Sequence, residues 1–157
     1  MKKIGEYTAR GIVSETDTDA GDPQKIPLFD GRFDTAYRVK EFYIWPSDVG
    51  SVDNFECVGK LSKNDDGTLT DSDFFRADDD NQIAWAGNDG AGGGKWTNNT
   101  SIVDPDNLIV EDLYVYARTL SSATADPINY MVILEKYAIT DWQGALAMAR
   151  DRAQGDI

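Results

Sequence analysis

The sequence predicts a mainly β protein, an antiparallel β-sandwich of jelly-roll type that ends in one α-helix. Two segments near the C-terminus, residues 108–118 and 128–139, alternate apolar and polar residues with the period of a half-buried strand. The segment that follows changes to the helical period. Turn-forming residues separate many short strand candidates, which is typical of sandwiches and jelly rolls. The length of 157 residues fits a single domain, 1–157.

The earlier strand candidates are shorter and are bounded by glycine, proline, asparagine and aspartate. The alternation in 35–45 slips near Lys40 and Glu41, which predicts a β-bulge. Asn64 and the three residues after it predict a hairpin turn, with residues 68–70 starting the return strand. The other strand candidates are 4–14, 25–29, 55–62, 82–86 and 101–103. In the first of these we expect the apolar members to be Ile4, Tyr7, Ala9 and Val13.

The predicted helix spans residues 139–154. Thr140 and Gln143 have the spacing of a capping box, in which each side chain bonds the backbone amide of the other residue. Gly144 is an objection, because glycine costs a helix about 1 kcal/mol relative to alanine. One face of the helix is an apolar stripe, formed by Trp142, Leu146, Ala149 and Ala153. This stripe either covers an open face of its own sheet, which is the more ordinary interpretation, or forms an interface with a neighbouring molecule.

Charge and composition exclude several classes of function. The chain has 28 acidic and 15 basic residues, for a net charge of −13, which argues against binding nucleic acid or an anionic membrane. It has no histidine, which removes the commonest general base and most zinc sites. Cys57 is the single cysteine, so no disulfide forms within the chain. No segment has enough consecutive apolar residues for a membrane span.

Two kinds of loop resemble ligand sites, and for each the alternative is a solvated surface loop. Residues 90–95 (GAGGGK) fail the phosphate-loop pattern, because Asp89 stands where a glycine is required and Trp96 where serine or threonine is required. Residues 15–22 alternate carboxylates like the start of a calcium loop, but Ile26 stands at the twelfth position in place of glutamate. Residues 78–80 and 104–107 are similar acidic loops. We expect no metal or cofactor. The alternative is that these acidic loops bind calcium.

Catalytic residues are not predicted, so the protein is not expected to be an enzyme. A pair of facing carboxylates could hydrolyse glycosidic bonds, but no spacing marks such a pair. The carboxylates considered are Asp106, Glu111, Asp112 and Glu135. Exposed aromatic rings could stack on sugars. Trp45 and Trp85 lie in strands and are expected in the core, whereas Trp96 is the best exposed candidate.

Four segments resemble small virion structural proteins of marine bacterial viruses (bacteriophages). They are GRFD (31–34), IAWA (83–86), VDPDNLIVEDLYVYA (103–117) and INYMVILEKYAITDWQGALAMARDRAQ (128–154). The resemblance covers roughly the whole chain and is strongest after residue 100. It implies a structural role in a virus particle and carries no catalytic residues with it.

These observations lead to two expected functions. The first is a non-enzymatic capsid, cement or vertex protein of a virion, which contacts other capsid proteins or copies of itself and forms a homo-oligomer. The second is a carbohydrate-binding or host-attachment module, with calcium in its acidic loops. The first is favoured because the resemblance implies it, while each catalytic motif considered fails on spacing or residue type.

Overall fold

The computed structural model describes residues 1–13, 23–47, 57–65, 74–88, 99–119, 127–140, 143–144, 146–147 and 149–150. Strands dominate this part of the chain, as the alternating patterns predict. They are β1 (Lys2–Val13), β2 (Gln24–Ile26), β3 (Thr35–Pro46), β4 (Cys57–Ser62), β5 (Gln82–Asn88), β6 (Asn99–Val103), β7 (Leu113–Thr119) and β8 (Ile128–Ala138).

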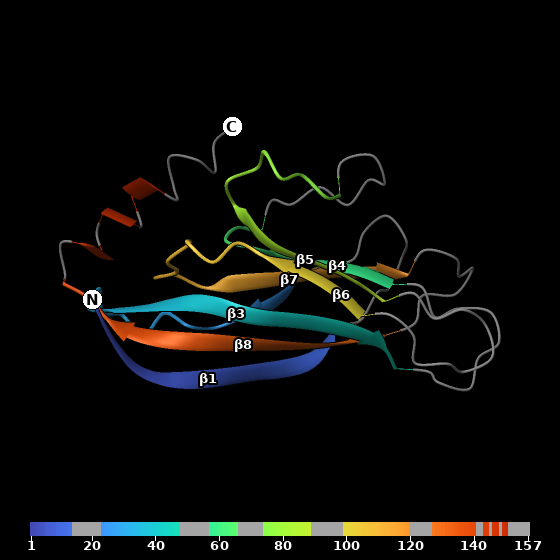
Figure 1. Ribbon diagram of the computed structural model, residues 1–157, viewed down its shortest axis with the longest axis horizontal. Coiled ribbons are helices and arrows are strands. Elements are labelled where there is room, and N and C mark those ends of the chain that lie inside the picture. Colours follow the sequence, from blue (N-terminus) through green and yellow to red (C-terminus); the bar gives the residue numbers. More distant parts are fainter. Residues whose placement is uncertain are drawn as a thin grey trace.

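The strands form two antiparallel sheets (Figure 1). The first has three long strands in the order β1-β8-β3, and the second has five strands in the order β2-β7-β4-β5-β6. The first and last strands of the chain are therefore neighbours, with Val13 opposite Ile128 and Lys2 opposite Ala138. The register between β3 and β8 shifts between Val39 and Glu41. This confirms the β-bulge that the sequence predicts there.

The core lies between the two sheets and takes side chains from both. On β4, Cys57 and Leu61 point into it, as the two-residue period requires. Gly59, between them, lies under Ile44 of the other sheet, and a Cβ there would be 3.1 Å from the Ile44 Cγ2 atom. The other core members include Val39, Phe42, Ile83, Leu113, Val115, Val132 and Leu134.

Several strand boundaries differ from the prediction, and the largest difference concerns residues 108–118. The strand β7 begins only at Leu113. Before it, Ile109 exchanges two backbone hydrogen bonds with Tyr37 of β3, both 2.8 Å long. The Asp112 carboxylate accepts the amide protons of Leu28 and Phe29, at 2.9 and 3.0 Å. These long-range bonds hold the segment away from the ladder, which alternation cannot reveal.

Smaller corrections apply near the N-terminus. The second predicted strand, 25–29, is shorter and ends at Ile26, since the Leu28 and Phe29 amides bond Asp112. In β1, Ala9 and Val13 are buried as expected, but Ile4 and Tyr7 are exposed. Residues 68–70, 15–22 and 90–95 lie outside the described residues.

The segment after β8 has helical backbone conformation at residues 143–144, 146–147 and 149–150. The Gln143 amide donates to the Thr140 hydroxyl over 3.2 Å, and the Thr140 amide donates to the Gln143 side-chain oxygen over 3.1 Å. These are the two bonds of the predicted capping box. A continuous helix over 139–154 stays a prediction, because 141–142, 145, 148 and 151–157 lie outside the described residues.

Candidate functional site

The C-terminal segment packs on the body through its small residues. A Cβ on Gly144 would overlap the carbonyl oxygen of Phe33, so the two backbones touch where glycine stands. Ala147, one turn further, packs against a small cluster that includes Ala36, Val110 and Ile139. Gly144 therefore has a steric reason to be in a helical segment. From the sequence alone, this glycine indicates only a loss of helix propensity.

The predicted apolar stripe turns away from this contact where it is described. Leu146 is 51% exposed, and Ala149 is also exposed. Trp142 and Ala153, the other two members, lie outside the described residues. Gly144 and Ala147 face the body, whereas Leu146 is half exposed, so the choice between a stripe that covers its own sheet and one that forms an interface stays a prediction. An apolar side chain at this position is free to contact another molecule.

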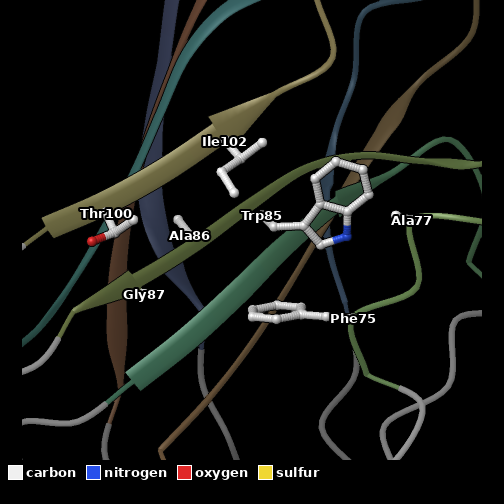
Figure 2. Close-up of a pocket in the computed structure, with 7 residues that line it drawn as sticks. All are labelled: Phe75, Ala77, Trp85, Ala86, Gly87, Thr100 and Ile102. Carbon is white, nitrogen blue, oxygen red and sulfur yellow. The ribbon is translucent and has the colours of Figure 1, made fainter.

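A second apolar surface lies on the outer face of β5 and β6. It is an open pocket of about 480 Å³ lined by Phe75, Ala77, Trp85, Ala86, Gly87, Thr100 and Ile102. Figure 2 shows the Trp85 ring beside Ile102, with the Phe75 ring facing the same open space. The Trp85 indole N–H donates to the Gln82 side-chain oxygen over 2.9 Å, which fixes the ring. Among the lining side chains only Thr100 offers a hydroxyl.

This pocket corrects the expectation for the tryptophans. Trp85 and Trp45 are both only partly buried and belong to the outer faces of their sheets. The reason for Trp85 is register: it lies opposite Lys60, whose side chain points out of the core. Trp96 lies outside the described residues.

Lys60 anchors the segment that carries Phe75. Its side chain is fully buried on the outer face of β4, against Phe74. The ammonium donates to the Phe74 carbonyl oxygen over 2.8 Å and lies 4.5 Å from the Phe74 ring centroid. It is also 5.2 Å from the ring centroid of Tyr116. Burial lowers the pKa of Lys60 to about 8. The negative charge of Asp79 acts in the opposite direction and raises this pKa by a smaller amount.

The acidic candidates serve local structure where they are described. Arg76 donates from two nitrogens to the Asp78 carboxylate, at 2.8 and 2.6 Å. Asp104 accepts the Asp106 amide and the Asn107 side chain. Among the residues that the structure describes, no three carboxylate or thiol groups gather in a way that could hold a metal ion. The acidic loop 15–22 lies outside them.

Two of the carboxylates considered for catalysis have structural partners. Asp112 bonds two backbone amides and pairs with Lys25 at 3.1 Å. Glu135, on the three-stranded sheet, pairs with Lys3 at 3.0 Å and accepts the Tyr137 hydroxyl. These two carboxylates therefore have separate structural partners.

Within the described residues, no helix is long and apolar enough to cross a membrane. Comparison with protein-family models, with curated proteins and with solved structures found no match for this chain.

Proposed function

We propose that this chain is a non-enzymatic structural component of a viral particle, a capsid, cement or vertex protein that contacts copies of itself or other capsid proteins. The virion setting comes from the resemblance of residues 103–117 and 128–154 to bacteriophage structural proteins. The body would be a jelly-roll-like sandwich with a continuous helix over 139–154.

The strand pairing supports a jelly roll. Such a fold is a long antiparallel hairpin wrapped into two sheets, so its strands pair in a nested order, first with last. The pairs β1·β8, β2·β7 and β4·β5 follow that order. The remaining nested pair would be β3·β6, and although β6 is hydrogen-bonded to β5, it also packs against β3. Jelly rolls include both capsid and lectin domains, so the fold alone does not select between the two expected functions.

The observation that carries the assembly proposal is the exposure of Leu146. Its neighbours Gly144 and Ala147 hold the segment against the body, so the leucine is presented on a fixed support. Contiguous apolar patches mark protein–protein contact sites, and in the proposed interface Leu146 contributes to such a patch.

The test compares two conservative changes at exposed aliphatic residues. Leu146→Gln removes the apolar contact, and Ile102→Gln is the matched control, since Ile102 is 63% exposed and lies in the pocket of β5 and β6. We expect sedimentation velocity to give oligomers for the unmodified protein and for Ile102→Gln, and at least a tenfold weaker association for Leu146→Gln. Equal association of the two variants would contradict the role of Leu146. A monomer at every protein and salt concentration would contradict self-assembly.

The second candidate function is carbohydrate binding, which the open pocket favours. Trp85 is held by Gln82, and with Phe75 it offers aromatic surface that could stack on the apolar face of a sugar. Its weakness is the lining, where Thr100 is the one side-chain hydroxyl. A glycan array probed with the unmodified protein and with Trp85→Ala, in calcium and in chelator, tests this candidate. Absence of any signal from the unmodified protein in both conditions would remove it.

A further inference from the structure

Among the described residues, no strand covers the outer edge of β1. β1 pairs with β8 along one side, and no described strand pairs with the other side. Figure 1 places β1 at the margin of the molecule, with no described element beyond it. The strand is 12 residues long and its exposed side chains include Tyr7 and Ile12. A long edge with unpaired backbone groups and exposed apolar residues is a template for pairing with another strand.

The other sheet edges in the described part of the chain are short or partly covered. The outer edge of β3 is bridged at Tyr37 by two backbone bonds to Ile109, and β6 packs beside the same strand. The second sheet ends in β2, which has three residues, and in β6, which has five. Short edges and covered edges are the usual means of preventing strand addition. Of the four edges, β1 therefore offers the longest open ladder.

The regular part of β1 is long enough to pair. The register with β8 shifts between Lys3 and Gly5, and from Gly5 to Val13 it continues without a further irregularity. The bulge and the lysines at positions 2 and 3 discourage pairing at the N-terminal end. A partner strand would therefore align with residues 5–11 or a similar run.

We propose that β1 pairs antiparallel with β1 of a second copy of this chain. The two-fold axis lies midway between the Thr8 residues of the two copies. The axis must place a residue opposite its own copy. Only then do both residues of every opposite pair direct their backbone N–H and C=O groups toward the partner strand, or both away from it. With Thr8 on the axis, Glu6 of each copy lies opposite Arg10 of the other, on the same face of the sheet. Tyr7, which is 46% exposed, lies opposite the small side chain of Ala9. Both charge pairs and size pairs are thus self-complementary.

The neighbouring registers lose this complementarity. An axis through Glu6 or through Arg10 places like charges opposite each other, which is destabilising. An axis through Tyr7 or Ala9 places Glu6 opposite Thr8 or Ile12. Among axes within the regular run from Gly5 to Val13, only the one at Thr8 gives two opposite-charge pairs.

The two charged groups can reach such an arrangement. Arg10 is exposed and has no ion-pair partner among the described residues. The Glu6 carboxylate contacts Lys3 at 3.0 Å and Lys40 at 3.6 Å and keeps half of its side-chain surface exposed. The cations beside it lower the pKa of Glu6, the Lys3 hydrogen bond most, so this carboxylate is charged at neutral pH. The product is one six-stranded sheet shared by two copies, an isologous interface.

This inference rests on the proposed self-assembly, and position-specific cross-linking tests it directly. Thr8→Cys places two thiols directly opposite each other at the axis, within disulfide reach. Glu6→Cys and Arg10→Cys are matched controls on the same face, whose two copies would lie about 13 Å apart along the strands. The native Cys57 is buried and burial raises the pKa of its thiol to about 12, so it does not interfere. Under a mild oxidant we expect at least tenfold more covalent dimer from Thr8→Cys than from either control.

Charge reversal gives an independent measurement. Glu6→Arg alone and Arg10→Glu alone each place like charges opposite each other in a homodimer. We expect each to weaken association at least tenfold by sedimentation, while an equimolar mixture of the two associates like the unmodified protein, because both pairs are then of opposite charge. Thermal unfolding of each variant checks that it is folded.

The outcomes separate this inference from the proposed function. Cross-linking that is absent at position 8, or equal at positions 6 and 10, overturns the pairing of β1. If the unmodified protein still assembles and Leu146→Gln weakens it, the structural role stands without the β1 interface. If the protein neither assembles nor cross-links at position 8, both fail.

Discussion

Replacing Lys60 by methionine tests how the outer face of the five-stranded sheet is held together. Lys60 is a fully buried amine whose described partners are the carbonyl oxygen and ring of Phe74 and the ring of Tyr116. Methionine has a similar length and no charge. Lys60→Met therefore removes the titrating group while it preserves most of the packing against Phe74.

The magnitude follows from the lowered pKa. Burial takes the pKa of Lys60 from its ordinary 10.5 to about 8. Between these values the unfolded chain binds the proton and the folded chain does not, so the free energy of unfolding rises with pH. Below pH 8 both states are protonated and the contribution is constant. At 1.36 kcal/mol for each pKa unit, stability gains about 3 kcal/mol between pH 8 and 10.5 from this group.

The assay is urea unfolding of both proteins at intervals from pH 7 to 10.5, followed by tryptophan fluorescence. Other groups titrate in both proteins, so the difference between the two free energies isolates Lys60. Over this range we expect the free energy of unfolding of the unmodified protein to rise by about 3 kcal/mol relative to that of Lys60→Met. A difference that stays constant with pH would refute the conclusion that Lys60 is desolvated.

Three further predictions concern packing and polar contacts. Gly144→Ala raises helix propensity but collides with Phe33, so hydrogen exchange of residues 143–150 should become faster; unchanged protection would contradict the close contact. Burial raises the pKa of Asp112, but the hydrogen bonds from two backbone amides and from Lys25 outweigh burial and leave the pKa lowered. The stabilisation from this carboxylate is therefore present above pH 4 and is lost as pH falls through the pKa of Asp112 in the folded protein. Asp112→Ala should cost about 1–3 kcal/mol at pH 7 by urea unfolding and reduce the acid sensitivity, whereas equal stability would show that the amides do not depend on the carboxylate. The Cys57 thiol, whose pKa burial raises to about 12, should react with a thiol reagent at pH 8 only at the rate of unfolding, and prompt labelling would place it at the surface.

Local patterns predicted those features that depend on neighbouring residues. The slip in alternation at Lys40 and Glu41 corresponds to the register shift of β3, and residues 128–139 correspond to β8 with a difference of one residue. The Thr140 and Gln143 spacing corresponds to two reciprocal hydrogen bonds. In each case the contact that decides the structure lies within a few residues of sequence.

Features that depend on distant residues could not be predicted in this way. Residues 108–112 alternate like a strand, but Ile109 bonds Tyr37 and Asp112 caps Leu28, across separations that no local pattern records. The burial of Lys60 was also missed, because a lysine in a strand is expected to be solvated. The pocket around Trp85 was missed for the same reason, since an aromatic residue in a strand is expected in the core. The resemblance to virion proteins and the two proposed interfaces stay predictions.

The pairing of β1 with β8 has a consequence for the order of folding. During synthesis the first strand is complete long before its partner, which begins at Ile128, leaves the ribosome. β3 needs the same partner, so neither of these long strands finds its ladder until β8 has been synthesised. Folding dominated by such non-local pairs is slow, in the range of about milliseconds to seconds. Throughout that delay, β1 is exposed along both edges to other nascent copies.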